Sequence, residues 1–259
     1  MISIIVCSRR PAEWNVHENN VRQTAGCPNE YIKIDNTGNT YGLCSAYNKG
    51  LEYARGEICV FMHEDVFMLQ YGWGAIIENK FRNDESLGLI GVAGTQYLFA
   101  DKPGWVAAGR PFIHGKVTHQ KGENCILTVY SWDNGDKEVV AVDGLFIAVR
   151  GSLFERIGFD DAIFDKFHFY DLDICMQVRK THKCIVTDEI VLKHFSGGSF
   201  DSLWKMYGDR FCRKYSDILP VSCIDKVPDQ SPERFESYDI TARIPEEVRR
   251  LGLDTGAEK

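Results

Sequence analysis

The chain has 259 residues, of which 44% are hydrophobic and 26% are charged. This apolar fraction is ordinary for a globular protein, so disorder along the whole chain is excluded, and the length suits one large or two small domains. Thirty Lys and Arg against 37 Asp and Glu give a net charge of −7. An acidic balance argues against a nucleic-acid partner, because sequence-independent binding to nucleic acid relies on a basic surface.

Targeting and membrane signals are not found in the sequence. No stretch approaches the roughly 20 apolar residues of a membrane span, and no basic region with a small-residue cleavage site opens the chain. We therefore expect a cytoplasmic protein with no transmembrane segment, for which peripheral membrane contact is possible. The nine cysteines form no C-x-x-C pair. They indicate free, mostly buried thiols, and a zinc or disulfide framework is the alternative.

The first 94 residues alternate between short apolar strands and helices. Strands are predicted over 2–6, 31–34, 58–62 and 87–93, and helices over 12–25, 43–54 and 73–82. Near-continuous apolar strands that alternate with helices indicate an α/β sheet that is parallel in this half. We expect the first three strands to be parallel neighbours, with helices on both faces of the sheet.

The pattern changes after residue 94. Strand-like runs at 116–119, 126–130 and 139–142, separated by Gly, Asn and Asp, indicate an antiparallel or irregular insertion. The predicted elements that follow are a strand at 144–149, a short helix at 152–157 capped by Ser152, a helix at 171–180, strands at 184–187 and 190–192, and a helix at 202–215. Prolines and charges then predict an extended arm over 218–259, with a short helix near 246–251 and frayed residues after 253.

Polar side chains follow each of the first three predicted strands. They are Cys7 and Ser8 after the first strand, Asp35 after the second, and His63, Glu64 and Asp65 after the third. Because the carboxyl ends of parallel strands lie at one edge of a sheet, we expect these groups to converge on one crevice. No Gly-x-Gly-x-x-Gly follows the first strand, which argues against a Rossmann-type dinucleotide site, and the missing Walker motif excludes a P-loop.

The triplet His63-Glu64-Asp65 is the sharpest local feature. Desolvating such carboxylates is costly unless a cation or hydrogen bonds compensate, and a hard divalent cation would also bridge to phosphate oxygens. The alternative is a helix cap or a surface turn. His194 follows the predicted strand 190–192 and precedes Gly197-Gly198, which allow backbone approach to a ligand. A lone histidine at a strand end is more often structural.

Asp171 and Asp173 stand at the start of the predicted helix 171–180. Either carboxylate could cap the helix or complement its dipole. The other interpretation is that one of them is a general base. Helical spacing places Asp171 on one face with Cys175 and turns Asp173 away, toward Gln177.

Six stretches in this order together resemble the family-2-like glycosyltransferases of the GT-A fold, most closely a bacterial subgroup. They are ISIIVCSRR over 2–10, IDN over 34–36, AYNKGLEYARGEICVFMHEDV over 46–66, VDGLFIAVRGSLFERIGFDD over 142–161, HFYDLDICMQVR over 168–179 and LKHFSGGS over 192–199. The resemblance implies a GT-A-like (Rossmann-like) mixed α/β sheet. It also implies a catalytic domain over 1–217, with a nucleotide-binding half (1–94) and an acceptor half (95–217), followed by the C-terminal arm.

The resemblance further implies a nucleotide-sugar donor, with a UDP-sugar favoured, bound across the first half of the sheet. Cys7 and Ser8 would line the nucleoside pocket, and a carboxylate at Asp35 would accept the uracil N3–H. Asn48 belongs to an Asn-x-Gly element that the family places near the base and ribose. Glu64 is the remaining expected donor contact.

A metal site is also implied. Asp65 matches the last acid of the Asp-x-Asp motif that holds the metal in this family, and His63 stands where the first acid would be. His194 matches a second metal ligand of many GT-A enzymes. The implied cofactor is Mn²⁺ or Mg²⁺.

Asp171 matches the catalytic base of the family, although Tyr170 stands where Glu is usual. Gly144 matches a position at which the backbone passes close to the donor sugar and the acceptor. One base that takes the proton of an attacking hydroxyl, with a metal that neutralises the diphosphate leaving group, predicts inversion at C1. Candidates for stacking on sugar rings are Trp105, Trp132 and Trp204.

Two other functions compete with this one. A catalytically inert nucleotide-sugar or glycan binding module is suggested by the missing first acid of the metal motif. A nucleotidyltransferase would use a similar sheet, nucleotide and metal, but it calls for a Gly-rich basic loop after the first strand, and Ser8-Arg9-Arg10-Pro11 contains no glycine. The acceptor that the resemblance implies is a glycan or another hydroxyl compound, and the resemblance names neither the sugar nor an oligomeric state.

Overall fold

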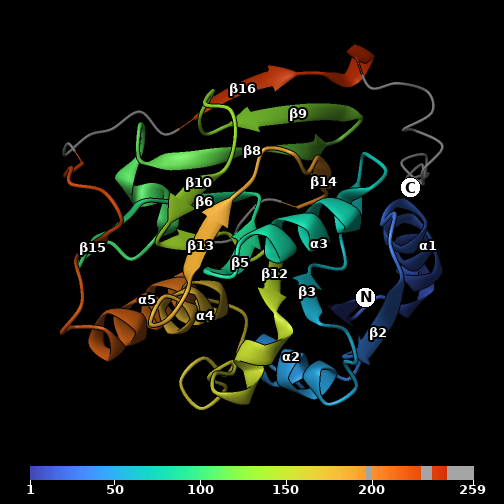
Figure 1. Cartoon of the computed structure of the whole chain (residues 1–259), viewed down its shortest axis with the longest axis horizontal. Helices are drawn as coiled ribbons and strands as arrows, with labels where there is room; N and C mark the ends of the chain where they lie inside the picture. Colours follow the sequence, from blue (N-terminus) through green and yellow to red (C-terminus); the bar gives the residue numbers. More distant parts are fainter. Residues whose placement is uncertain (197–199, 229–234, 244–259) are drawn as a thin grey trace.

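The computed structural model describes residues 1–196, 200–228 and 235–243 (Figure 1). The α-helices are α1 (Trp14–Thr24), α2 (Leu43–Leu51), α3 (Trp73–Asn83), α4 (Tyr170–Val178) and α5 (Ser202–Lys214). The strands are β1 (Ile2–Ser8), β2 (Asn29–Asp35), β3 (Ile58–Met62), β4 (Val66–Met68), β5 (Leu87–Gly91), β6 (Ala93–Thr95), β7 (Tyr97–Leu98), β8 (Ile113–Lys121), β9 (Asn124–Val129), β10 (Lys137–Val139), β11 (Ala141–Val142), β12 (Phe146–Arg150), β13 (Lys183–Val186), β14 (Leu192–His194), β15 (Val221–Ser222) and β16 (Glu236–Asp239).

The central sheet has the strand order β10-β13-β5-β12-β3-β1-β2. β1 pairs in parallel with both β2 and β3, as predicted for the first three strands. β12 runs antiparallel to its neighbours β3 and β5. The sheet is therefore mixed and parallel in its N-terminal half, which confirms the expected fold class.

Helices cover both faces of this sheet. Successive side chains of a strand point to opposite faces, so a single strand contributes to the apolar layer on each side. In β1, Ile2 and Ile4 belong to the same apolar cluster as Val21 of α1 and Trp73 of α3. Ile5 belongs to a second cluster that contains side chains of α2, α4 and α5. The core is thus two apolar layers on either side of the sheet.

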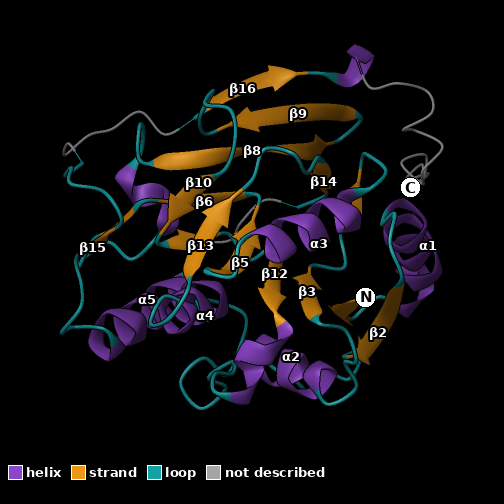
Figure 2. Ribbon diagram, in the orientation of Figure 1, coloured by secondary structure: helices purple, strands orange, loops and turns teal. Residues whose placement is uncertain are grey.

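A second sheet lies beside the first and has the order β11-β6-β8-β14-β4, extended by β9 and β16. β8, β9 and β16 lie together at the top of Figure 2, away from α2, α4 and α5. The hairpin of β8 and β9 is antiparallel, as expected for the insertion. Residues of the C-terminal arm add to the sheets, because β16 pairs with β9 and β15 pairs with β7.

Two segments that the sequence predicts as single strands are each divided between the sheets. Residues 87–93 separate into β5 and β6, and residues 139–142 separate into β10 and β11. Glycines allow the close approach at this bend: a Cβ on Gly91 would lie 2.6 Å from Val142, and one on Gly94 would lie 2.3 Å from the carbonyl of Ala141. The prediction of single strands was wrong because apolar runs do not reveal which sheet a residue joins.

Several element boundaries also differ from the prediction. The expected strand 190–192 is shifted, so that β14 begins at Leu192 and contains His194. The short helix predicted over 152–157 is a 3₁₀ turn over Gly151–Glu155, and its N-cap residue is Arg150 instead of the expected Ser152. The three-residue strand β4 was not predicted. The expected helix near 246–251, the residues after 253 and the Gly197-Gly198 pair lie outside the described residues.

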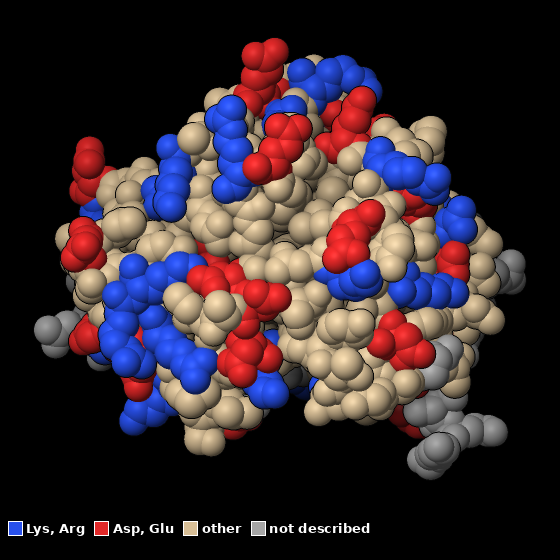
Figure 3. Space-filling model, turned by 90° about the horizontal axis from the view of Figure 1, so that it is seen from below, with Lys and Arg blue, Asp and Glu red and all other residues tan. Residues whose placement is uncertain are grey.

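All nine cysteines lie in the described part of the chain and are free, and five of them are buried. No helix among the described residues is both long enough and apolar enough to cross a membrane. On the face drawn in Figure 3, the largest group of Lys and Arg side chains lies directly beside a group of Asp and Glu side chains. This mixture of charges is typical of a solvated surface.

Candidate active site

A cavity of about 450 Å³ opens where the two sheets meet the start of α4. Its lining includes His63, Gly144, Asp171 and His194, which come from four different segments of the chain. Aromatic side chains form much of the remaining wall; they are Trp105, Tyr130, Phe167, Phe169, Tyr170, Phe200, Trp204 and Phe235. A concave, mainly apolar wall with a few convergent polar groups is the usual form of a small-molecule site.

Three potential metal ligands, His63, Asp65 and His194, lie together, and the two histidines line this cavity. His63 Nδ1 lies 3.5 Å from His194 Nε2, and His194 Nε2 lies 3.3 Å from Asp65 Oδ1. One ligand atom from each residue lies within 4.8 Å of those of the other two. The structure therefore brings Asp65 and His194 together and adds His63, which sequence reasoning did not assign as a ligand.

Strand pairing places these side chains. The triplet forms the short connection between β3 and β4, closed by a hydrogen bond from Val66 N to His63 O. β14 runs antiparallel to β4 with His194 opposite Val66. His194 is thereby held beside Asp65, and the amide of Phe195 donates to the Asp65 carbonyl. β4, which the sequence pattern did not reveal, sets the register that brings Asp65 and His194 together.

The electrostatics of the cluster suit a divalent ion. Burial opposes ionisation of Asp65, but the hydrogen bond and charge of His194 outweigh burial and hold the pKa of Asp65 well below its usual range. Burial lowers the pKa of His63 to about 4, so the imidazole is neutral at physiological pH and free to coordinate. Two imidazole nitrogens and one carboxylate oxygen are a donor set that fits a divalent metal.

Asp171 occupies the second position of α4 and faces the cavity. Its Oδ2 accepts a hydrogen bond of 3.0 Å from the amide of Gly144. Burial, together with the charge of Asp143, raises the pKa of Asp171 to about 7, although the amides of the first helical turn oppose this shift. A carboxylate with a pKa near 7 is suited to accept a proton at neutral pH.

The backbone around Asp171 is closely fitted. A Cβ on Gly144 would lie 2.2 Å from the hydroxyl of Tyr170, so only glycine fits at this position. Phe169, the residue before α4, has a left-handed conformation with φ of 66°. A bulky residue in this region costs on the order of 1–3 kcal/mol, and such strain is concentrated at functional sites. Packing of its ring against Trp204 and Phe211 holds it there.

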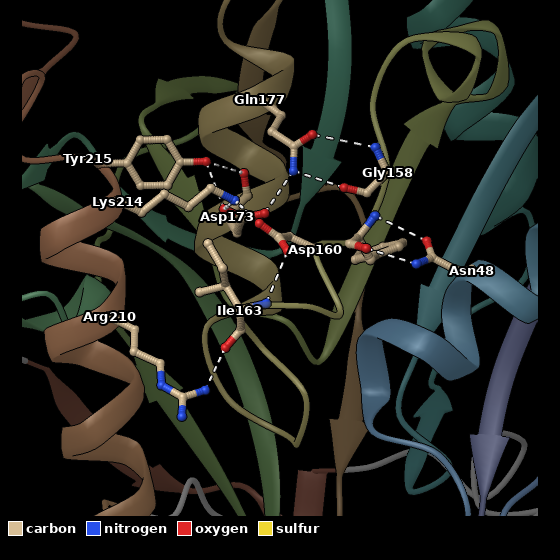
Figure 4. A network of polar contacts seen from close by, with 10 residues as sticks. Asn48, Gly158, Asp160, Ile163, Asp173, Gln177, Arg210, Lys214 and Tyr215 are labelled. Carbon is tan, nitrogen blue, oxygen red and sulfur yellow. Dashed lines mark hydrogen bonds and ion pairs between the residues drawn. The ribbon is translucent and has the colours of Figure 1, made fainter.

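Asp173 lies in a network of polar contacts between α4 and α5 (Figure 4). It is fully buried and accepts hydrogen bonds from Lys214 Nζ at 2.5 Å, from the Tyr215 hydroxyl at 2.7 Å and from Gln177 Nε2 at 2.7 Å. Helical spacing predicted its orientation toward Gln177. These contacts join α4 to α5 on the side of α4 that faces away from the cavity.

We expect Asp173→Asn to lower the free energy of unfolding by about 2–4 kcal/mol, because it breaks a buried ion pair and leaves Lys214 with one acid partner fewer. Chemical denaturation at pH 7 measures this effect. A wild-type unfolding midpoint in this variant would show that the network contributes nothing. Because of this buried network, Asp173→Asn is a poor control for a substitution of Asp171.

The predicted donor contacts gather at the carboxyl ends of β1, β2 and β3. Ser8 lies opposite Asp35 in the β1–β2 pairing, and its hydroxyl bonds the carboxylate of Glu64. Glu64 also accepts from the amide of Arg9 at 3.1 Å. Burial raises the pKa of the adjacent Cys7 to about 11, so its thiol stays protonated. Asp35 is exposed, and Thr37 donates to its Oδ1.

Asn48 and Trp132 have other surroundings than expected. The Asn48 amide group bonds the backbone of Phe159, accepting from its N–H at 3.1 Å and donating to its carbonyl at 2.8 Å (Figure 4). We therefore interpret Asn48 as an anchor of the 158–165 loop and leave it out of the donor site. Trp132 is 55% exposed and bonds Glu236, outside the cavity wall. Trp105 and Trp204 line the cavity.

A comparison with known protein families identifies the family of this chain. The model of the glycosyltransferase-like family matches residues 3–216. The chain belongs to this glycosyltransferase-like family. No curated protein matches the transferase closely.

Solved structures of GT-A glycosyltransferases share the fold of this transferase. GalNAc-T7, solved with UDP, GalNAc and Mn²⁺, is 11% identical with a TM-score of 0.51, covering 76% of this chain and 44% of that chain. The mannosyltransferase PcManGT from Pyrobaculum calidifontis, solved with GDP-Man and Mn²⁺, is 15% identical with a TM-score of 0.51, covering 88% of this chain and 65% of that one. This chain thus spans less than two thirds of either protein, and at this identity the likeness shows the fold alone.

Proposed function

We propose that this transferase moves a sugar from a nucleotide-diphosphate sugar, with a UDP-sugar favoured, to an acceptor hydroxyl with inversion at C1. The observation that carries the proposal is that His63 and His194, which form one cluster with Asp65, line the same cavity as Asp171. The cluster would hold Mn²⁺ or Mg²⁺, which when bound neutralises charge on the diphosphate leaving group. We assign donor binding to the half over 1–94 and acceptor binding to the half over 95–217.

Asp171 acts as the general base in this proposal. Its Oδ2 is held by the Gly144 amide, which orients the carboxylate while the other oxygen can take the proton of the acceptor hydroxyl. The acceptor oxygen forms its bond to C1 as the bond from C1 to the diphosphate breaks. One base and an in-line displacement invert C1, and base catalysis of this kind contributes about 10²- to 10⁴-fold in rate.

We assign the base of the donor to the carboxyl ends of β1, β2 and β3, outside the residues that line the cavity, and the acceptor to the aromatic wall of the cavity. The exposed carboxylate of Asp35 suits the N3–H of uracil, and Cys7, Ser8 and Glu64 form the adjoining edge. The indoles of Trp105 and Trp204 suit a sugar ring, because an aromatic face packs against the apolar face of a pyranose. A glycan or another hydroxyl compound with a flat apolar side fits this wall.

An inert binding module is the second candidate function. The argument for it was that the first acid of the metal motif is missing. His63 supplies a ligand atom at that place, within the same cluster as Asp65 and His194. A pure binding module also gains nothing from a carboxylate whose pKa is raised to about 7 beside the cavity.

The experiment that tests the proposal is a panel of UDP-sugars and GDP-sugars incubated with the purified protein and Mn²⁺. We expect one donor to raise the melting temperature and to release nucleoside diphosphate slowly, since water can replace the acceptor. Addition of EDTA should abolish both effects. A rise in melting temperature without turnover, with water or with a panel of glycan acceptors, would identify a binding module instead.

A further inference from the structure

His63, directly after the end of β3, and Tyr170, the first residue of α4, touch each other in the structure. His63 Nε2 lies 2.7 Å from the Tyr170 hydroxyl oxygen, although 107 residues separate them in sequence. Tyr170 is only 3% exposed, so this hydrogen bond is shielded from water.

A third residue, Gly144, determines where the protons lie in the contact between His63 and Tyr170. The Tyr170 hydroxyl oxygen also lies 2.9 Å from the carbonyl oxygen of Gly144, which can only accept a hydrogen bond. The single hydroxyl proton of Tyr170 is therefore donated to Gly144, and the hydroxyl oxygen accepts from His63 Nε2–H. Neutral His63 then carries its lone pair on Nδ1, the atom that faces His194 Nε2.

The orientation of His63 has a chemical consequence for the metal site. An imidazole whose far nitrogen is tied to a buried partner is fixed in tautomer and ring angle, which strengthens it as a ligand. Two nitrogens and one carboxylate suit first-row transition metals, whereas Mg²⁺ prefers oxygen ligands and keeps several waters. The donor set thus discriminates among the divalent ions.

We propose that Tyr170 is a positioning residue that fixes His63 as the third metal ligand, and that the resulting site selects Co²⁺ and Mn²⁺ over Mg²⁺. This inference rests on the metal site of the proposed function but not on its donor or acceptor. Tyr170 also connects the metal site to the base, because Gly144, which accepts from the Tyr170 hydroxyl, donates its own amide proton to Asp171.

The test measures metal binding without any sugar nucleotide. Isothermal titration calorimetry with Mn²⁺, Co²⁺ or Mg²⁺ alone is applied to the wild type, Tyr170→Phe and His63→Asp, and the visible absorption of bound Co²⁺ reports nitrogen ligation. Tyr215→Phe is the matched control. It removes another buried tyrosine hydroxyl bonded to α4, through Asp173 (Figure 4). Neither Tyr215 nor Asp173 lines the cavity.

We expect the wild type to bind Co²⁺ and Mn²⁺ at least about tenfold more tightly than Mg²⁺. Tyr170→Phe should weaken Co²⁺ and Mn²⁺ binding by about 10- to 100-fold and change the Co²⁺ spectrum, as loss of an outer-shell partner does. His63→Asp should bring the affinities for Co²⁺ and Mg²⁺ closer together. Tyr215→Phe should bind all three ions like the wild type.

The inference would be overturned if the wild type and Tyr170→Phe bound the metal ions with equal affinity. It would also be overturned if His63→Asp left the ratio of the Co²⁺ and Mg²⁺ affinities unchanged. The inference would also be overturned if Tyr215→Phe weakened metal binding as much as Tyr170→Phe does. That result would show that loosening α4 is enough to weaken the metal site. These outcomes are separate from a failure of the proposed function, which is read from nucleoside diphosphate release. A protein that binds metal selectively but turns over no sugar nucleotide would retain this inference and lose the transferase mechanism.

Discussion

Asp171→Asn is expected to lower kcat for sugar transfer by about two to four orders of magnitude while donor affinity changes little. Asn keeps the shape of the side chain and can still accept the 3.0 Å hydrogen bond from the Gly144 amide, but it cannot take a proton. The measurement is steady-state transfer kinetics together with donor titration. A nearly silent Asp171→Asn would favour a role in the first helical turn only and would remove the assignment as base.

The pH dependence provides an independent check on Asp171. The base must be ionised to act, and the pKa of Asp171 is raised to about 7, so kcat should rise with pH through about 7 and then level off. The folded state binds this proton more tightly than the unfolded state, for which a pKa of about 3.9 applies. The stability that this proton gives to the folded state is fully present below a pH of about 3.9 and is lost as the pH rises toward 7. Asp171→Asn should therefore be at least as stable as the wild type at pH 8, which separates lost chemistry from lost folding.

Asp65→Asn should abolish metal-dependent donor binding. Asn keeps the size of the side chain but removes the only negative charge of the three-residue cluster, so we expect metal affinity to fall by more than about 100-fold, beyond the loss caused by removing an outer-shell partner. Calorimetry with Mn²⁺ and with the donor identified by the panel measures both losses. Wild-type Mn²⁺ affinity in this variant would exclude Asp65 as a ligand.

Glu64→Gln is the matched control for Asp65→Asn. Glu64 is the neighbouring acid of the same connection, but its side chain bonds Ser8 and the Arg9 amide and lies outside the metal cluster. We expect Glu64→Gln to leave the affinity for Mn²⁺ alone unchanged and to weaken the donor. Asp65 is paired with His194, so Asp65→Asn should slightly lower stability above the unfolded pKa of an aspartate.

Much of the fold could be predicted from the sequence because short apolar strands and their spacing are local signals. The runs at 2–6, 31–34 and 58–62 are parallel neighbours in the structure. The pattern could not show that the chain bends at Val92 and Val140 from one sheet into the other, because both sides of each bend are equally apolar. It also missed β4, since three residues carry no periodicity.

Part of the candidate site was also predicted from the sequence. Asp65, His194, Asp171 and Gly144 were assigned by resemblance. The structure places the last three in the lining of one cavity, with Asp65 beside His194. Asn48 was assigned in the same way, but its amide is bonded to Phe159 across 111 residues. His63 was seen only as a replaced acid, because a motif written for carboxylates gives an imidazole no role.

By itself the sequence determined the class of the protein: an α/β transferase fold, polar groups at the ends of its strands, and a family membership carried by motifs in order. Tertiary structure alone decided which of these groups act together. Pairing of β4 with β14 places His194 beside Asp65, and burial of Tyr170 connects His63 to Gly144 and Asp171. The physical reason is that strand register and desolvation depend on contacts between distant segments, whereas periodicity and motifs depend only on near neighbours.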